Sequence, residues 1–88
     1  MIAEYLRSGQ GNAVPLRHLV KLTGFDSRTV RRLIANERRQ GVPILSDCTT
    51  GYYLAANDQE RAAFVRSMRQ RVREILRAAD GVESGGAR

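Results

Sequence analysis

The stretch "FDSRTVRRLIANERRQG", residues 25–41, decides the fold of this chain. Its apolar residues are spaced i, i+3, i+4, as on one face of a helix: Val30, Leu33 and Ile34. Asp26 or Ser27 suits the N-cap of such a helix, and Gly41 suits its C-terminal end. The sequence therefore predicts a helix over about residues 27–40.

The arginines of this helix form a stripe opposite its apolar face. At 100° per residue from Val30, the opposite pole holds Arg28, Arg32 and Arg39. The flanking positions are Arg31 and Arg38 on one side and Thr29 and Asn36 on the other. Such a stripe is either a solvated helix face or a surface that contacts a polyanion.

Two segments before this helix have helical patterns of their own. Residues 2–8 suit a short amphipathic helix, and a second helix is expected over about residues 16–23. Gly24 permits a tight turn into the arginine-rich helix, and we expect Phe25 to plug the corner. The order helix, turn, helix is that of a helix-turn-helix motif.

After the arginine-rich helix, the short runs "ILS" and "YYL" around "DCTTG" predict a β-hairpin with Gly51 near its turn. A long helix is expected over about residues 59–79. The fold class is therefore mainly α with a small β-hairpin: a winged helix-turn-helix plus a long C-terminal helix. We divide the chain into a domain at 1–57, an amphipathic helix at 58–80 and a disordered tail at 81–88.

Composition narrows the class of protein. The chain has 88 residues and a formal net charge of +6, which favours polyanions such as DNA or RNA. One cysteine and one histidine exclude an all-Cys/His structural zinc site and an internal disulfide. We find no catalytic constellation, phosphate-binding loop or signal-peptide pattern, so we expect a cytoplasmic protein that is not an enzyme and needs no cofactor or metal.

The segment "LVKLTGFDSRTVRRLI…GVPILSDCTTGYYL" resembles the winged helix-turn-helix of bacterial repressors, particularly the biotin-operon-repressor type. That family runs from a capped "S-x-x-T-V" helix to "G-x-P-I" and then "G-Y-x-L". The matching residues are Asp26…Thr29-Val30, Gly41-Val42-Pro43-Ile44 and Gly51-Tyr52-Tyr53-Leu54. The resemblance covers about residues 12–55, and the whole chain looks like small DNA-binding proteins of Gram-positive phages and mobile elements.

The resemblance implies a sequence-specific double-stranded DNA-binding protein, serving as a transcriptional regulator or as a DNA-binding factor of a phage or mobile element. The helix at 27–40 would enter the major groove. The expected DNA contacts are Ser27, Arg28, Thr29, Arg31, Arg32, Asn36, Arg39, Thr49 and Thr50. The alternative is a winged-helix adaptor that binds other proteins and no specific DNA.

Two residues depart from this pattern. Glu37 occupies a position that should face the core, so its carboxylate reaches an arginine or His18, or else this end of the helix is less buried. The wing has no cation, and Asp47 should repel phosphate. We therefore expect the wing to pack, or to touch the DNA backbone through Thr49 or Thr50 at most.

The long C-terminal helix carries a seam with 3-4-3-4 spacing, as in a coiled coil: Val65, Met68, Val72, Ile75 and Ala79. A stripe of arginines lies beside it: Arg66, Arg69, Arg73 and Arg77. Three arrangements would cover the seam, namely packing on its own domain, pairing with the same helix of a second copy, or lying on a membrane. Because helix-turn-helix proteins commonly bind paired half-sites, we expect a homodimer through this helix and no membrane contact.

Overall fold

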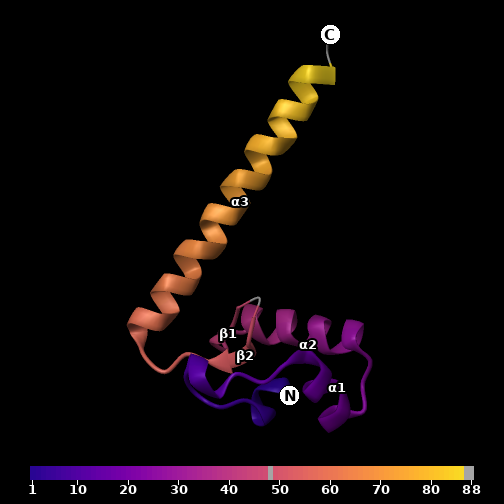
Figure 1. Ribbon diagram of the computed structural model, residues 1–88, viewed down its shortest axis with the longest axis vertical. Helices are drawn as coiled ribbons and strands as arrows, with labels where there is room; N and C mark the ends of the chain where they lie inside the picture. Colours follow the sequence, from indigo (N-terminus) through magenta and orange to yellow (C-terminus); the bar gives the residue numbers. More distant parts are fainter. Residues whose placement is uncertain (48, 87–88) are drawn as a thin grey trace.

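The computed structural model describes residues 1–47 and 49–86; Cys48 and the last two residues of the predicted tail lie outside the described residues. Figure 1 shows a small body from which one long helix projects. The principal elements are α1 (Leu16–Thr23), α2 (Ser27–Arg39), β1 (Ile44–Asp47), β2 (Gly51–Leu54) and α3 (Asp58–Gly86). The predicted mainly helical fold, with a two-stranded antiparallel hairpin and a long C-terminal helix, is confirmed.

Local hydrogen bonds form the turn between α1 and α2. Gly24 adopts a left-handed conformation (φ 78°), which glycine reaches at no steric cost. The Asp26 side chain accepts a hydrogen bond from the Thr29 amide (2.8 Å) and caps α2. Hydrogen bonds from Thr29 hold the pKa of Asp26 below its usual value. The expectation that Phe25 fills the corner between the two helices is wrong, since its side chain is 47% exposed. Hydrogen bonds of polar groups close the turn instead.

The hairpin is joined to the N-terminal segment by backbone hydrogen bonds. Val14 and Tyr52 exchange N–H···O bonds of 2.7 and 2.9 Å, and the Leu54 amide donates to the Arg7 carbonyl (2.8 Å). A Cβ at Gly51 (φ 123°) would collide with the backbone of Val14, so this close approach requires glycine. The hairpin is thereby fixed against residues that precede α1.

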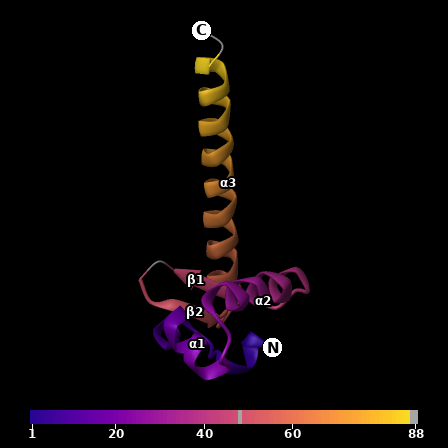
Figure 2. The ribbon, with the colours of Figure 1, turned by 90° about the vertical axis from the view of Figure 1, so that its right-hand side faces the viewer.

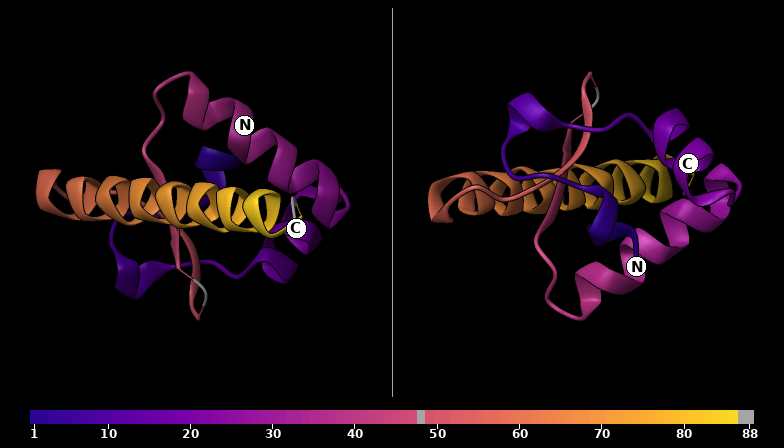
Figure 3. Two further views of the ribbon diagram at one scale, coloured as in Figure 1. Left: turned by 90° about the horizontal axis from the view of Figure 1, so that it is seen from above. Right: turned by 90° about the horizontal axis from the view of Figure 1, so that it is seen from below.

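The hydrophobic core formed by the described residues lies against α2. Leu19 of α1, Val30 and Ile34 of α2 and Ile44 of β1 pack together with Ile2. Figure 3 shows the arrangement from both ends: α3 and α2 lie in front when the molecule is seen from above, and the N-terminal segment and α1 lie in front when it is seen from below. The side of α2 turned away from this core is consequently open to solvent.

Glu37 is buried on the core side of α2, with 5% of its surface exposed. Its two carboxylate oxygens accept hydrogen bonds from the backbone amides of Ile2 (2.7 Å) and Ala3 (2.9 Å). Glu37 therefore pairs with neither an arginine nor His18 among the described residues, and this end of α2 is not less buried, so all three expectations are wrong. Its partner is the main chain at the start of the molecule. The helix expected over residues 2–8 is instead a short 3₁₀ helix, η1 (Ile2–Tyr5), whose free amides this carboxylate satisfies.

Arg38, the next residue, joins α2 to the hairpin and to α3. Its Nε donates to the Ile44 carbonyl (2.7 Å) and its Nη2 donates to Ser46 Oγ (3.2 Å). Its guanidinium also lies over the Phe64 ring of α3, 5.2 Å from the centroid. Burial lowers the pKa of Arg38. Arg38 is therefore a structural residue at the base of α3.

α3 begins with a reciprocal cap and then leaves the body. The Glu60 amide donates to Asn57 Oδ1 (2.8 Å), and the Ala56 amide donates to Glu60 Oε1 (2.9 Å). Figures 1 and 2 show the helix rising away from α2 and the hairpin, which makes the molecule 51 Å long. In the described residues, no helix combines the length and the apolarity that a membrane span needs.

The predicted end of this helix is wrong. α3 continues to Gly86, so residues 81–86, assigned above to a disordered tail, are helical. Once a helix is formed, each added residue contributes one more backbone hydrogen bond, so a short glycine-containing end extends it at low cost. The extension brings Val82 and Glu83 onto the helix.

We predict that Glu37→Ala destabilises the protein by about 2–4 kcal/mol. The reason is that the backbone amides of Ile2 and Ala3 lose the carboxylate that accepts their hydrogen bonds. The change is measured by urea denaturation. Gln40→Ala, an exposed change at the end of α2, is the control and should alter stability by less than about 0.5 kcal/mol. Equal midpoints for Glu37→Ala and the original chain would contradict a supporting role for the carboxylate.

Candidate nucleic-acid interface

Four of the five arginines of α2 lie exposed where the helical periodicity predicts, and the fifth, Arg38, is half-buried against the hairpin. Val30 and Ile34 are buried on one side, while the side chains on the opposite side are exposed. We call these exposed residues the arginine face of α2: Arg28, Arg31, Arg32 and Arg39. They follow one solvent-exposed side of a helix held on the body by the core.

None of the residues of the arginine face forms an ion pair within the described part of the chain, although, besides the hydrogen bonds from Thr29, the charge of Arg32 helps to lower the pKa of the Asp26 carboxyl. There, the ion pairs are those of the Met1 ammonium with Glu4 and of Arg61 with Asp58. Arg39 Nη1 donates to Asn36 Oδ1 (3.0 Å), an exposed contact between two of the predicted site residues. The face therefore presents guanidinium groups outside any ion pair of the described residues, and such groups suit phosphate or guanine acceptors.

The two remaining α2 residues of the predicted site lie at its first turn. Ser27 is exposed, and Thr29 is half-buried with its amide bonded to Asp26. The N-terminal end of α2 thus combines the exposed hydroxyl of Ser27 with the exposed side chain of Arg28.

A groove between α1, α2 and the hairpin brings further predicted residues together. Arg31, Thr49 and Thr50 all line it, and Arg17 of α1 joins them. Sequence reasoning missed Arg17. The signal in the sequence that indicates Arg17 is its position in the first turn of α1, next to the apolar Leu16 that packs on the core. The groove gives the hairpin, which has no cation of its own among its described residues, two neighbouring cations.

Asp47 organises the tip of the hairpin. Its carboxylate accepts hydrogen bonds from the amides and the hydroxyls of both Thr49 and Thr50, and from Gln10 Nε2 (2.5 Å). Hydrogen bonds from Thr50, then Gln10, hold the pKa of Asp47 far below its usual value. Asp47 therefore has a structural role that sequence reasoning missed, and the two threonine hydroxyls already donate within the turn.

The predicted dimerisation residues lie on α3 and differ in exposure. Val65 is half-buried near the body, whereas Met68, Val72, Ile75 and Ala79 are exposed. Met68 still lines a groove with Arg38 and Asp47 of the body. Beyond it, the seam residues Val72 and Ile75 are more than half exposed. Packing on its own domain thus accounts for the base of the helix and not for the rest.

α3 and α2 lie on the same side of the body. Figures 1 and 2 both show α3 rising from the side on which α2 lies, with α1 and the N-terminal segment on the other side. At the base of α3, Arg71 lines a groove together with Arg38 and Asp47.

No three metal-ligating side chains come together in residues 1–47 and 49–86.

We predict that Asp47→Asn lowers the stability of the hairpin near neutral pH. Because the pKa of Asp47 is depressed on folding, its carboxylate contributes stability above its usual pKa of about 4, and this contribution is lost as the pH falls through the folded-state value. The difference in thermal midpoint between the two proteins should therefore shrink from pH 7 to pH 2. Asp80→Asn, on the exposed part of α3, serves as the control. A difference that stays constant with pH would contradict the assignment.

In comparisons with known proteins, no family model, no curated protein and no solved structure matches this chain.

Proposed function

We propose that the protein binds double-stranded DNA sequence-specifically, with α2 in the major groove, and that it acts as a homodimer through α3. The role fits a transcriptional regulator or a DNA-binding factor of a phage or mobile element. One observation carries the proposal: none of the four exposed guanidinium groups of the arginine face forms an ion pair among the described residues.

The chemistry of this face favours DNA over a generic anion. A major groove is about 12 Å wide and admits one helix, and arginine forms two-point contacts with guanine O6 and N7. Arg28 and Arg32 lie near the N-terminal end of α2 and opposite its buried side, so they are the proposed base-reading residues. Arg31 lies beside them and Arg39 lies further along the same side of α2, and both suit phosphate contacts, which set affinity and orientation.

The neighbouring elements would assist in different ways. Arg17 lies at the groove beside the hairpin, where it supplies the positive charge that the hairpin lacks. The Thr49 and Thr50 hydroxyls donate to Asp47, so a phosphate would have to compete with that carboxylate for them. A duplex against α2 would lie alongside α3, because both are on the same side of the body.

A protein-binding adaptor is the second candidate. Exposed apolar side chains favour it: Met1, Tyr5, Leu22 and Phe25 are all exposed, and three of them line one groove with Leu33. Binding to DNA through phosphates should weaken steeply as salt rises, whereas docking on this apolar groove should not. Salt titration with duplex DNA therefore separates the two candidates.

We predict that Arg28→Ala and Arg32→Ala each reduce binding to the selected duplex about 5- to 150-fold, corresponding to 1–3 kcal/mol of discrimination per two-point contact. Binding to a random duplex should fall much less. The target is first obtained by selecting bound sequences from a random duplex pool, and affinities are then compared at fixed salt.

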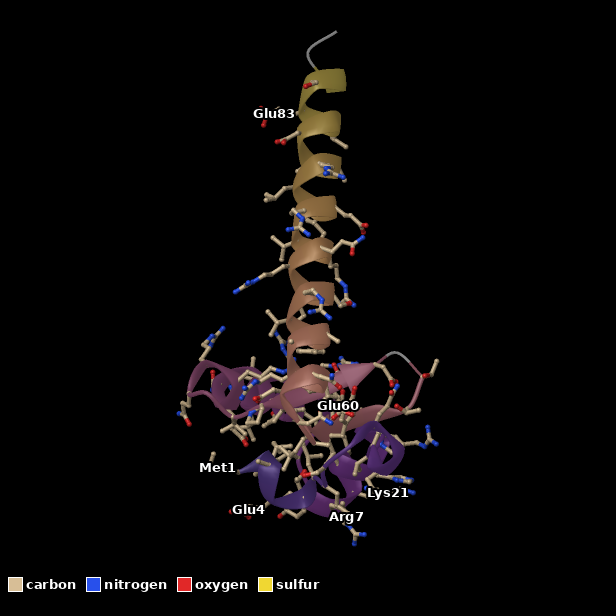
Figure 4. All side chains as sticks on the ribbon, turned by 90° about the vertical axis from the view of Figure 1, so that its left-hand side faces the viewer. Met1, Glu4, Arg7, Lys21, Glu60 and Glu83 are labelled. Carbon is tan, nitrogen blue, oxygen red and sulfur yellow. The ribbon has the colours of Figure 1, made fainter. Side chains whose placement is uncertain are left out.

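The matched control is Arg7→Ala, which removes one exposed arginine on the side of the body away from α3, as Figure 4 shows. It should leave both affinities nearly unchanged. Equal losses on selected and random duplex for Arg28→Ala and Arg32→Ala would reduce those residues to phosphate contacts. If the chain selects no sequence and binds no duplex at low salt, the proposed function is wrong.

We also predict that Val72→Glu gives monomers and weakens DNA binding, because a single half-site holds poorly. Sedimentation equilibrium at tens of micromolar measures the association. Gln70→Glu adds the same charge on the exposed side of α3 away from the seam and should leave the dimer intact. Since Val72 is exposed, neither change should unfold the body; a monomeric original chain would refute the dimer.

A further inference from the structure

The helical extension of α3 lengthens its apolar seam. Val82 follows Ala79 by three residues and continues the spacing of Val65, Met68, Val72, Ile75 and Ala79. The exposed fraction grows with distance from the body, from 41% at Met68 through 55% at Val72 to 77% at Val82. The part of α3 that needs a partner is therefore the segment from Met68 to its end.

The residues beside this seam are not alike on its two sides. One side carries Arg69, Leu76 and Glu83 at seven-residue intervals, and the other carries Arg71 and Ala78. Leu76 is 58% exposed, and Figure 4 shows Glu83 near the far end of the helix. The side with Leu76 thus holds a cation at one end, an apolar residue in the middle and an anion at the other end.

A parallel pairing of two such helices leaves these groups mismatched. In a parallel coiled coil, the residue on one flank faces the residue five positions later on the opposite flank of its partner. Leu76 would then face Arg71, and Glu83 would face Ala78. An apolar side chain would meet a cation, and neither Arg69 nor Glu83 would find an opposite charge.

An antiparallel pairing matches every group on that side. When the two helices run in opposite directions, like flanks face each other, so Leu76 meets Leu76 of the second copy near the two-fold axis. Arg69 then lies opposite the second copy's Glu83, and the pair occurs twice. In the seam, the same register sets Val72 opposite Val82 and Ile75 opposite Ala79.

We propose that α3 of a second copy covers this seam in the antiparallel sense, centred near Leu76, with Arg69 and Glu83 as reciprocal ion pairs. This inference rests on the proposed homodimer and specifies its geometry. In this register the partner helix ends beside Met68, so it stops short of Phe64 and Val65, which are half-buried at the body. If the partner helix were shifted by one heptad toward the body, its end would collide with the hairpin and Arg38.

The arginines on the outer side of α3 stay free in this arrangement. Arg66 and Arg73 line an open hollow on the helix surface that excludes the seam residues, and Arg77 continues the same side. The body of each copy lies at an opposite end of the paired helices. The two arginine faces of α2 are then separated by the length of the overlap.

Disulfide trapping in the full chain tests the orientation. Cys48 is replaced by serine, and Val72→Cys and Val82→Cys are made separately in that background. In the antiparallel dimer, position 72 faces 82 of the partner, while 72 and 72 lie about 15 Å apart, too far for a disulfide. A mixture of the two variants should therefore form a covalent dimer on mild oxidation, and neither variant alone should do so.

A charge exchange tests the ion pairs independently of cysteine chemistry. Arg69→Glu and Glu83→Arg should each weaken dimerisation about three- to tenfold, since each reversal turns two attractive rim pairs into repulsive ones. The double variant Arg69→Glu/Glu83→Arg should restore association to within about twofold. In a parallel dimer these residues are about 21 Å apart along the axis, so no restoration would occur. Arg73→Glu, outside the seam, is the matched control.

The outcomes separate this inference from the proposal on which it rests. A covalent dimer of Val82→Cys alone, or a double charge variant as weak as the single ones, overturns the antiparallel pairing and leaves the homodimer in place. A monomeric original chain in sedimentation overturns both. Loss of DNA binding with the dimer intact bears on α2 and leaves the α3 pairing unaffected.

Discussion

The placement of the hairpin and of α3 relative to α2 depends on the contacts of Arg38. One planar guanidinium reaches the Ile44 carbonyl, the Ser46 hydroxyl and the Phe64 ring, and so fixes the hairpin and α3 to the last turn of α2. Its neighbour Glu37 holds the N-terminal segment from the same turn. Two adjacent charged residues thus anchor the N-terminal segment, the hairpin and α3 to the last turn of α2. Both are desolvated, but each is paired with several polar groups, which is the condition under which buried charge is tolerated.

Local patterns in the sequence were sufficient for the elements themselves. The i, i+3, i+4 spacing, the Asp26 cap and the glycine at each helix end gave α1 and α2 almost to the residue, because these signals act within one or two turns. The partners of Glu37 could not be predicted in this way. They are backbone amides 34 and 35 residues away, and a main-chain amide carries no residue-specific mark in the sequence. The end of α3 was missed because glycine is a poor helix former on average, whereas an existing helix extends cheaply.

The candidate site was predictable in part for the same reason. Helical rotation alone predicts the exposed positions of Arg28, Arg31, Arg32 and Arg39 on α2, and the structure has them there, whereas Arg38 turns toward the hairpin. The hydrogen bonding at the hairpin tip was not predictable, because the sequence shows the charge of Asp47 but not the groups that donate hydrogen bonds to it. The carboxylate of Asp47 accepts hydrogen bonds from five donor groups. Four of these donors are placed by the turn geometry, and the fifth belongs to Gln10, which is 37 residues away in the sequence. That the arginine face reads DNA stays a prediction.

The attachment of α3 by its first turns makes the helix a lever. It has 29 residues and touches the body near Phe64 and Val65, so most of its length is an unsupported arm of roughly 30 Å at 1.5 Å per residue. A pivot of about 5° at the Arg38–Phe64 contact would move the far end by nearly 3 Å for an arm of that length. Small adjustments in side-chain packing at the base are therefore magnified at the tip. Whatever α3 carries or joins, its placement relative to α2 is set by a few atoms at the pivot.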